Sequence, residues 1–379
     1  MTVPNVHFGP VDLVTVLPYL MLAVMLGVVL LAVPVLTWVE RVTLGLVHDR
    51  LGPNRVGPRG LLQPIADGIK LFFKEDLLPA NADRRLFYLA PVLAMIPPLL
   101  GAALVPIGMV RVDLGNGQTR PLPLVVADLN IGALWVLALA SLQVYGLILG
   151  GWSSNNKYSL LGALRASAQT VSYELAMSTA LLVAVFMSGT LNLAAIVQSQ
   201  GGGIARWNFL RWFPLGLIAC VVYLIAMVAE TNRAPFDLPE AESELVAGFQ
   251  TEYSSMKFAI FFMSEYAAMV IASCVAAALW LGGWHSPLAV LEVVPGPIWF
   301  FGKVGLLIFG YIWIRATLPR FRYDALMRFG WKQLFPIALA VLLTMAVLDT
   351  FRTDPSAKSS IPPKPEKPKP LMSGPMGSR

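Results

Sequence analysis

An all-α membrane protein with about eight transmembrane helices is the fold class that this sequence predicts. Hydrophobic residues make up 56% of its 379 residues and charged residues 13%, with a mean hydropathy of +0.67, far from the averages of soluble domains. We expect one helix bundle over residues 1–351, because no internal repeat is visible. Apolar runs long enough to cross a hydrocarbon core of about 30 Å lie near residues 13–36, 87–110, 131–150, 171–188, 213–229, 258–282, 298–314 and 333–349.

The loop after the first run contains two Gly-Pro pairs, Gly52-Pro53 and Gly57-Pro58. Because proline cannot continue a helix and Gly-Pro marks turns, we expect a compact, irregular hairpin at the membrane face. From Gly60 the spacing becomes helical and predicts an amphipathic helix along the membrane interface. That helix either anchors the surface or frames an opening for an amphipathic substrate. Its apolar face consists of Leu62, Ile65, Ile69, Phe72 and Phe73.

Lys and Arg are concentrated in alternate loops, which predicts the orientation of the chain in its membrane. The opposite loops hold only Arg111, Arg120, Arg206 and Arg211. Since cytoplasmic loops carry the excess of positive charge, we expect both termini outside. A tail rich in Pro and Lys, residues 352–379, is expected to be a disordered arm. The four loops expected in the cytoplasm are 41–86, 151–170, 230–257 and 315–332.

An unusually acidic stretch follows the fifth apolar run, with Arg233 as its single cation between residues 230 and 252. So many like charges beside hydrocarbon cannot all stay ionised at ordinary pKa values, so the cluster is suited to proton exchange. The three glutamates after Pro239 are equally compatible with capping the first turn of a helix. Arg233 is equally compatible with a surface pair to Asp237 or Glu230. The acidic side chains are Glu230, Asp237, Glu240, Glu242, Glu244 and Glu252.

Two further carboxylates, Glu174 and Glu265, lie inside apolar runs. An intramembrane carboxylate is costly if ionised, so it stays protonated, pairs with a base or lines water. We expect a role in proton transfer for both, with a helix-to-helix hydrogen bond as the alternative. Cys220 and Cys274 are expected to be small core residues.

The sequence contains no pattern for a resident metal, redox cofactor or nucleotide. Its three histidines, His7, His48 and His285, are widely separated, and neither GxGxxG nor GxxxxGK[ST] occurs. We therefore expect no metal site, and we expect any redox cofactor to belong to a partner. A secondary transporter is disfavoured because paired halves with broken helices are absent.

The motifs of this chain resemble, in order and over nearly its whole length, the quinone-site membrane subunit of respiratory NADH:quinone oxidoreductase (complex I), found in bacteria and mitochondria. A Pro/Lys tail and a polar insert near residues 205–211 depart from the family pattern. The motifs that carry the resemblance are Trp38 to Arg41, Gly52 to Pro58, Gly60 to Asp67, Lys70 to Glu75, Gly151 to Tyr158, Ser172 to Glu174, Ala229 to Arg233, Pro235 to Asp237, Glu240 to Val246 and Thr251 to Tyr253.

The resemblance implies two sets of site residues. One set binds ubiquinone or menaquinone in a chamber shared with peripheral subunits. Phe236 and Phe249, which belong to it, are equally compatible with plain packing. The members of this set are Arg41, Arg55, Asp67, Lys70, Arg233, Phe236 and Phe249. The other set couples quinone reduction to proton translocation and has no catalytic residue of its own: Glu40, Glu174, Glu230, Glu240, Glu242, Glu244, Glu252 and Glu265.

The resemblance also implies partners and a location. NADH, FMN and iron-sulfur clusters are expected only in partner subunits, which comprise the peripheral arm and the small and antiporter-like membrane subunits, with lipid around them and no nucleic acid. The expected location is a bacterial cytoplasmic (inner) membrane. The alternative is the equivalent subunit of an ion-pumping membrane hydrogenase or a ferredoxin-linked relative, which the loops around Gly52 and Pro235 match less closely.

Overall fold

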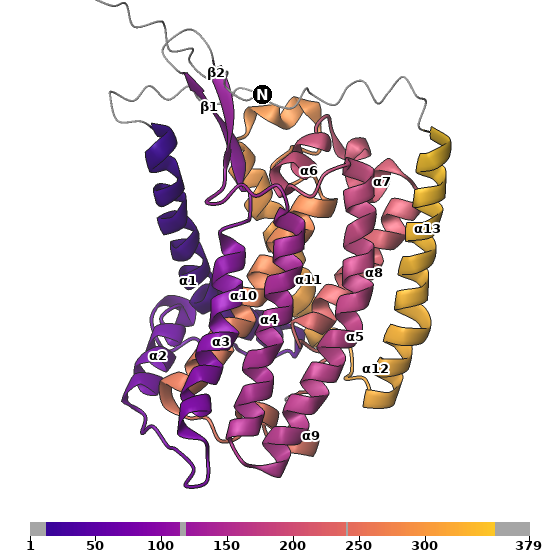
Figure 1. Ribbon diagram of the computed structural model, residues 1–379. Helices are drawn as coiled ribbons and strands as arrows, with labels where there is room; N and C mark the ends of the chain where they lie inside the picture. The colour runs from indigo at the N-terminus through magenta and orange to yellow at the C-terminus, as the bar shows by residue number, and fades with distance from the viewer. Residues whose placement is uncertain (1–12, 114–118, 240–241, 353–379) are drawn as a thin grey trace, which may run out of the picture.

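The computed structural model describes residues 13–113, 119–239 and 242–352 as one bundle of helices (Figure 1). Within these ranges, seven helices are long and apolar enough to cross a membrane, and one apolar helix of 16 residues is shorter. The prediction of an all-α polytopic membrane protein is confirmed. The principal helices are α1 (Leu13–Val47), α3 (Arg84–Ala102), α4 (Gly132–Ser153), α5 (Lys157–Ser188), α8 (Leu215–Glu230, the shorter one), α10 (Ser255–Trp280), α11 (Gly296–Thr317) and α13 (Phe335–Arg352).

Short elements are gathered at the two ends of the bundle (Figure 1). The start of α1 and the end of α13 lie at the same end, which we call the hairpin end. Besides β1 (Gly108–Asp113) and β2 (Thr119–Leu124), it carries α6 (Leu193–Ser199), η2 (Ile204–Arg206), α7 (Asn208–Arg211) and η4 (Ala289–Val293). The opposite end, the loop end, carries η1 (Pro58–Gly60), α2 (Gln63–Phe73), α9 (Glu242–Leu245), η3 (Gly248–Gln250), α12 (Tyr323–Phe329) and η5 (Gly330–Leu334).

The amphipathic helix expected in the first loop is α2, which packs on α1 and α10. No residue of α2 is buried, and the apolar side chains Ile65, Ile69, Phe72 and Phe73 are between 56% and 80% exposed. Such an uncovered apolar stripe is typical of a helix that lies on a membrane interface. The two Gly-Pro pairs precede α2 in an irregular loop, which is held to α1 by a hydrogen bond from Trp38 Nε1 to the Arg59 carbonyl (3.1 Å).

The apolar run expected as a helix over residues 87–110 is only partly helical, and this expectation is corrected. Helix α3 ends at Ala102, and β1 pairs antiparallel with β2, so that Gly108 faces Leu124. Alternation of apolar and polar residues from Val110 to Asp113 is the period-two pattern of a strand. Hydropathy alone could not separate this strand from the helix before it.

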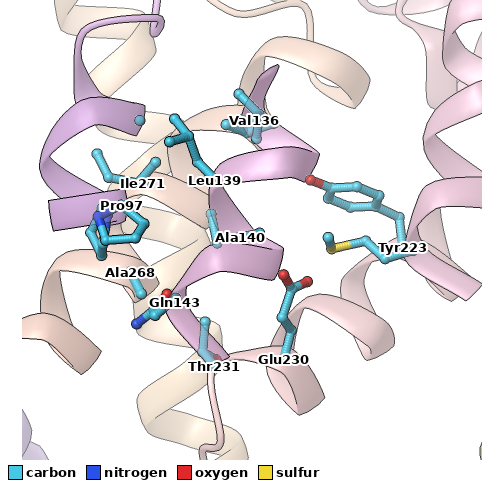
Figure 2. A pocket seen from close by; sticks show the side chains of 15 residues that line it. Pro97, Val136, Leu139, Ala140, Gln143, Tyr223, Glu230, Thr231, Ala268 and Ile271 are labelled. Carbon is cyan, nitrogen blue, oxygen red and sulfur yellow. The ribbon is translucent and has the colours of Figure 1, made fainter. Parts of the chain in front are cut away.

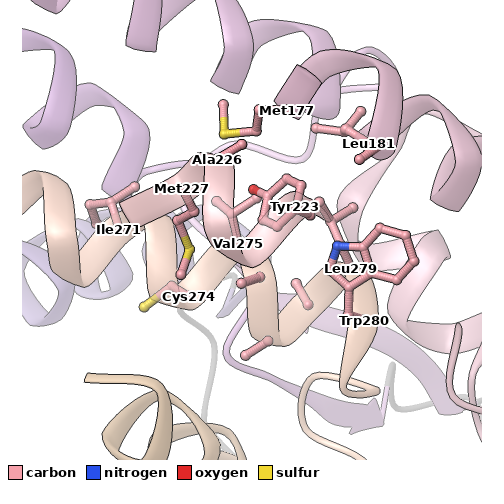
Figure 3. Packing of buried hydrophobic residues seen from close by; sticks show 14 of the residues in the cluster. Met177, Leu181, Tyr223, Ala226, Met227, Ile271, Cys274, Val275, Leu279 and Trp280 are labelled. Carbon is pink, nitrogen blue, oxygen red and sulfur yellow. The ribbon is translucent and has the colours of Figure 1, made fainter. Parts of the chain in front are cut away.

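Close packing of small residues brings the helices together and fixes the loop end. A Cβ atom added at Gly146 of α4 would lie 2.6 Å from the Ala94 backbone of α3, and one at Gly162 of α5 would lie 2.8 Å from Gly248 of η3. Such contacts let membrane helices gain van der Waals energy without a hydrophobic driving force. The interior between α5, α8 and α10 is filled by large side chains (Figure 3). Cys220 and Cys274 are buried there and free, as predicted.

Candidate functional site

A buried ion cluster lies near the loop end, around Glu40 of α1. The Tyr266 hydroxyl of α10 donates to Glu40 Oε2 over 2.7 Å. Arg315, near the end of α11, forms an ion pair with Oε1, and Arg233 Nη1 lies 3.6 Å from the same oxygen. The Glu40 side chain is only 6% exposed. We call these four residues the Glu40 cluster; two guanidinium groups offset the cost of removing the carboxylate from water.

Arg233 is the most enclosed cation of the Glu40 cluster. Its guanidinium carbon lies 4.1 Å above the Tyr266 ring, and Nε and Nη2 are buried without a hydrogen-bond partner among the described residues. Burial alone would lower the pKa of Arg233, but the acidic groups Tyr266, Glu40 and Glu265 outweigh burial and raise it. The side chain therefore stays charged and keeps donors for a further acceptor.

Arg41 and Asp67 connect the end of α1 to α2 next to the Glu40 cluster. Arg41 Nη1 lies 2.5 Å from Asp67 Oδ2, with the side chains 48% and 34% exposed. Gln63 Nε2 donates to the other oxygen of Asp67 over 3.1 Å. Arg55 and Lys70, also expected in a quinone site, are exposed on the same loop and helix.

Glu230, at the end of α8, points into a cavity of about 70 Å³ between α3, α4, α5, α8 and α10. In Figure 2 its carboxylate lies between Tyr223 and Gln143. A second cavity of about 20 Å³ is lined by Glu230, Gln143, Thr231 and Glu265. Because a water molecule needs roughly 10–15 Å³ and polar partners, both cavities can hold water. Two of the expected carboxylates, Glu230 and Glu265, therefore share a cavity with room for water.

Those of the other expected carboxylates whose side chains the structure describes do not line these two cavities. Glu174 of α5 accepts a hydrogen bond from Ser141 of α4, the helix-to-helix contact given as the alternative. At the loop end, Glu244 pairs with Arg165 over 2.5 Å, and Glu252 accepts from Asn156 Nδ2 over 2.6 Å. Glu240 lies outside the described residues, and Glu242 is described only as backbone, where it begins α9.

Two aromatic residues expected at the quinone site are enclosed by other rings. Phe236 is 5% exposed and lies 5.6 Å, centroid to centroid, from both Tyr173 and Phe321. Phe249 is 1% exposed and lies 5.3 Å from Phe261. Their described contacts are packing, and contact with a quinone stays a prediction.

Sequence reasoning missed several groups of the site, and the pair of Arg233 with Asp237 that it left open as an alternative is not formed among the described residues. Asp237 pairs with Arg320 over 3.1 Å, whereas Arg233 approaches Glu40. Tyr266 follows Glu265 directly in the sequence, but a tyrosine within an apolar run is usually interpreted as a residue of the hydrophobic core. Arg315 was interpreted only as a charge of a cytoplasmic loop. Arg315 follows Tyr311 by four residues, so both side chains lie on one face of α11. That spacing could have indicated that the two residues belong to one polar site.

No group of three or more His, Cys, Asp or Glu side chains suited to a metal ion occurs in the described ranges. The polar groups present are instead carboxylates, guanidinium groups and hydroxyls, which can hold and move protons and bind an oxygen acceptor. The described side chains are therefore suited to proton transfer and to ion pairing.

Comparison with known proteins identifies the family. A family model described as NADH dehydrogenase matches residues 20–346. The H-type subunit of NADH-quinone oxidoreductase from Rickettsia canadensis (strain McKiel) is 50% identical over 322 residues, which cover 84% of this chain and 90% of that protein. The second H-type subunit of NADH-quinone oxidoreductase from Koribacter versatilis (strain Ellin345) is 46% identical over 352 residues, covering 89% of this chain and 98% of that protein. The chain therefore belongs to the family of H-type subunits of NADH-quinone oxidoreductase and is a membrane subunit of the complex I enzyme.

Proposed function

We propose that this subunit forms, with peripheral subunits, the chamber in which a quinone is reduced, and that it couples this reduction to proton translocation through Glu40, Glu230 and Glu265. The quinone is the substrate, ubiquinone or menaquinone, and NADH, FMN and iron-sulfur clusters belong to partner subunits. Its relatives are named as H-type subunits of NADH-quinone oxidoreductase, which favours this assignment over a hydrogenase-type subunit.

The location proposed is a bacterial inner membrane, with the loop end in the cytoplasm and both termini outside. Support comes from the Lys and Arg residues of the loops that meet at the loop end, since positive charge is retained on the cytoplasmic side. The peripheral subunits would then dock at the loop end, while antiporter-like and smaller subunits pack along the helices.

The observation that carries the proposal is the Glu40 cluster, a buried carboxylate held by two arginines at the end of α1. The Arg315 side chain is 39% exposed and the Glu40 side chain is 6% exposed. The Arg315 guanidinium is therefore accessible from outside the bundle while it is paired with the buried carboxylate. Next to the cluster, α2 presents exposed Ile69 and Phe73. Guanidinium donors beside apolar surface suit a molecule with a polar oxygen-bearing head and an isoprenoid tail.

The chemistry follows from the charges. Reduction of a quinone to quinol takes up two electrons, which partners supply, and two protons. Negative charge that develops on the headgroup oxygens competes with Glu40 for the arginines. When the Glu40 carboxylate loses part of its ion pairing, its buried charge is less well compensated, and in the proposed coupling a proton moves to the cluster to offset it. Since Glu230 and Glu265 share a cavity of the bundle, a change of charge at Glu40 can shift their proton occupancy as well.

The test replaces Glu40 by Gln in the intact complex and compares three activities in inner-membrane vesicles. We expect NADH oxidation by ferricyanide to remain, while NADH:quinone turnover and proton pumping fall at least about tenfold, since the charge at the cluster is removed. Asp324→Asn is the matched control, because Asp324 is an acid of the loop end that is 63% exposed. Wild-type quinone turnover and pumping in Glu40→Gln would remove Glu40 from the mechanism.

A further inference from the structure

Two buried hydroxyl groups lie between the Glu40 cluster and the Glu230 cavities. Thr231, directly after α8, has its Oγ1 atom 3.4 Å from the hydroxyl oxygen of Tyr311 on α11. Thr231 is 7% exposed and Tyr311 is 4% exposed. Neither residue belongs to the carboxylates and arginines expected from the sequence.

Each hydroxyl faces a different polar space. Tyr311 lines a small pocket of about 10 Å³ together with Glu40, Arg233 and Arg315. Thr231 lines both cavities that contain Glu230. The pocket beside Glu40 is at the lower limit for one water molecule, and the larger cavity has room for several. The contact between the Tyr311 and Thr231 hydroxyls therefore lies between the pocket beside Glu40 and the cavities that contain Glu230.

Among the described residues, the Thr231 hydroxyl has three hydrogen-bond acceptors within reach of its proton. Besides Tyr311, the Met227 and Val228 carbonyls each lie 3.1 Å from Oγ1. A hydroxyl has one proton and two acceptor lone pairs, so it can receive from one neighbour while it donates to another. When Thr231 donates to a helix carbonyl, its lone pairs are available to the Tyr311 hydroxyl. Rotation of the Thr231 hydroxyl about its Cβ–Oγ1 bond lets it donate to Tyr311 instead, which reverses the direction of the hydrogen bond between the two residues.

We propose that Tyr311 and Thr231 form a hydroxyl relay that moves protons between the Glu40 cluster and the Glu230 cavities; this rests on the coupling function proposed above. In one transfer, a protonated Glu40 gives its proton through water to Tyr311, which passes its own to Thr231 Oγ1. Thr231 releases its original proton through water to the Glu230 carboxylate, so Glu40 ends ionised and Glu230 ends protonated. As many O–H bonds form as break, both hydroxyls end neutral, and nothing is oxidised or reduced. The reverse transfer uses the same atoms.

The relay is tested with variants that remove one oxygen each in the intact complex, reconstituted in proteoliposomes. Thr231→Val and Tyr311→Phe keep the shape of the side chain and lose the hydroxyl, whereas Thr231→Ser keeps it. Proton pumping during NADH:quinone turnover is expected to fall about tenfold or more in the first two, and the serine variant is expected to retain at least half. Because the two groups act in series, the double variant should lose no more than either single variant.

Controls separate a relay from a structural contact. Thr344→Val on α13 removes an exposed hydroxyl that also bonds a helix carbonyl, at 2.7 Å from Ala340 O, and should pump normally. NADH:ferricyanide activity reports the amount of assembled complex in each preparation, so a variant that assembles poorly is corrected for its content. If Thr231→Val does not assemble at all, Tyr311→Phe decides alone.

The outcomes distinguish the relay from the function on which it rests. Normal pumping in Thr231→Val and Tyr311→Phe, while Glu40→Gln and Glu230→Gln lose pumping, would overturn the relay and leave the proposed function standing. A serine variant as deficient as the valine variant would also overturn it, since the hydroxyl would not be what matters. Normal pumping in both glutamine variants would overturn the proposed function and the relay together.

Discussion

Lys303 provides a strong test of how the hairpin end is held together. Its ammonium group, on α11, donates to the carbonyl oxygens of Leu281 (2.6 Å), Gly283 (2.8 Å) and His285 (2.7 Å). It also lies 3.9 Å above the ring of Trp207. These carbonyls follow the end of α10, so the cation lies at the negative end of the helix dipole. All three donor positions of the ammonium are used.

Lys303→Met keeps most of the side-chain volume and removes all three donors. The bonds to Gly283 and His285 are buried and the bond to Leu281 is partly buried. Removing the partner of a buried carbonyl costs about 1–3 kcal/mol. Taking the lower value for each, because desolvating the ammonium already offsets part of its benefit, local opening of this region should become easier by about 3 kcal/mol. Every 1.4 kcal/mol is a factor of ten in an equilibrium constant. The population of the opened state should therefore rise on the order of 100-fold.

Thiol labelling measures this opening in the assembled complex. Cys274 is buried on α10, near the segment that Lys303 holds, so a maleimide reaches it only when the region opens. The rate is read by mass spectrometry of the peptide that contains Cys274, under conditions in which it follows the opened population. Lys332→Met, at an exposed position of the loop end, is the control. A labelling rate within about threefold of wild type in Lys303→Met would refute the reasoning from unpaired carbonyls.

Three further changes test other contacts. Tyr266→Phe removes a charge-assisted hydrogen bond to Glu40, worth about 1.5–3 kcal/mol; quinone turnover should fall about tenfold or more with ferricyanide reduction intact, and an unchanged turnover would contradict a role for this bond. Gly162→Leu forces a side chain against the Gly248 backbone and should lower stability by about 1–3 kcal/mol, seen as a lower melting temperature of the complex. Asp67→Asn breaks a half-exposed ion pair and should change stability by less than about 1 kcal/mol; a larger loss of melting temperature would show that the pair is stronger than its exposure implies.

The parts of the fold that follow from local composition could be predicted from the sequence. A run of apolar residues long enough to cross a bilayer must become a helix there, since every backbone group has to be paired within the segment. The helix α2 follows from the spacing of Ile65, Ile69 and Phe72. The strand β1 could not be separated from α3 because both are apolar and adjoin without a charged residue between Ala102 and Val110.

The site could be predicted only in its individual residues. Glu230 was found because a charge beside hydrocarbon is expensive, whereas Glu40 and a quinone role for Arg233 were implied by the resemblance to the complex I subunit. Their partners could not be found, because Tyr266 and Arg315 lie 226 and 275 positions from Glu40, and no local spacing relates such distant residues. The pairing of Arg233 with Glu40, rather than with its sequence neighbour Asp237, is likewise set by how α1, α8 and α10 pack.

Packing of this kind also explains why the proposed coupling needs no large motion of the helices. Arg233 and Arg315 approach the same oxygen of Glu40 from different elements, so an acceptor that draws either guanidinium away leaves a buried carboxylate with one cation. A buried carboxylate that loses a partner is left with an uncompensated charge, which is costly. In the proposed relay, the Tyr311 and Thr231 hydroxyls connect this position to the Glu230 cavities. The energy of a changed charge at the loop end can thus be passed into the bundle by side chains alone, over single hydrogen-bond steps.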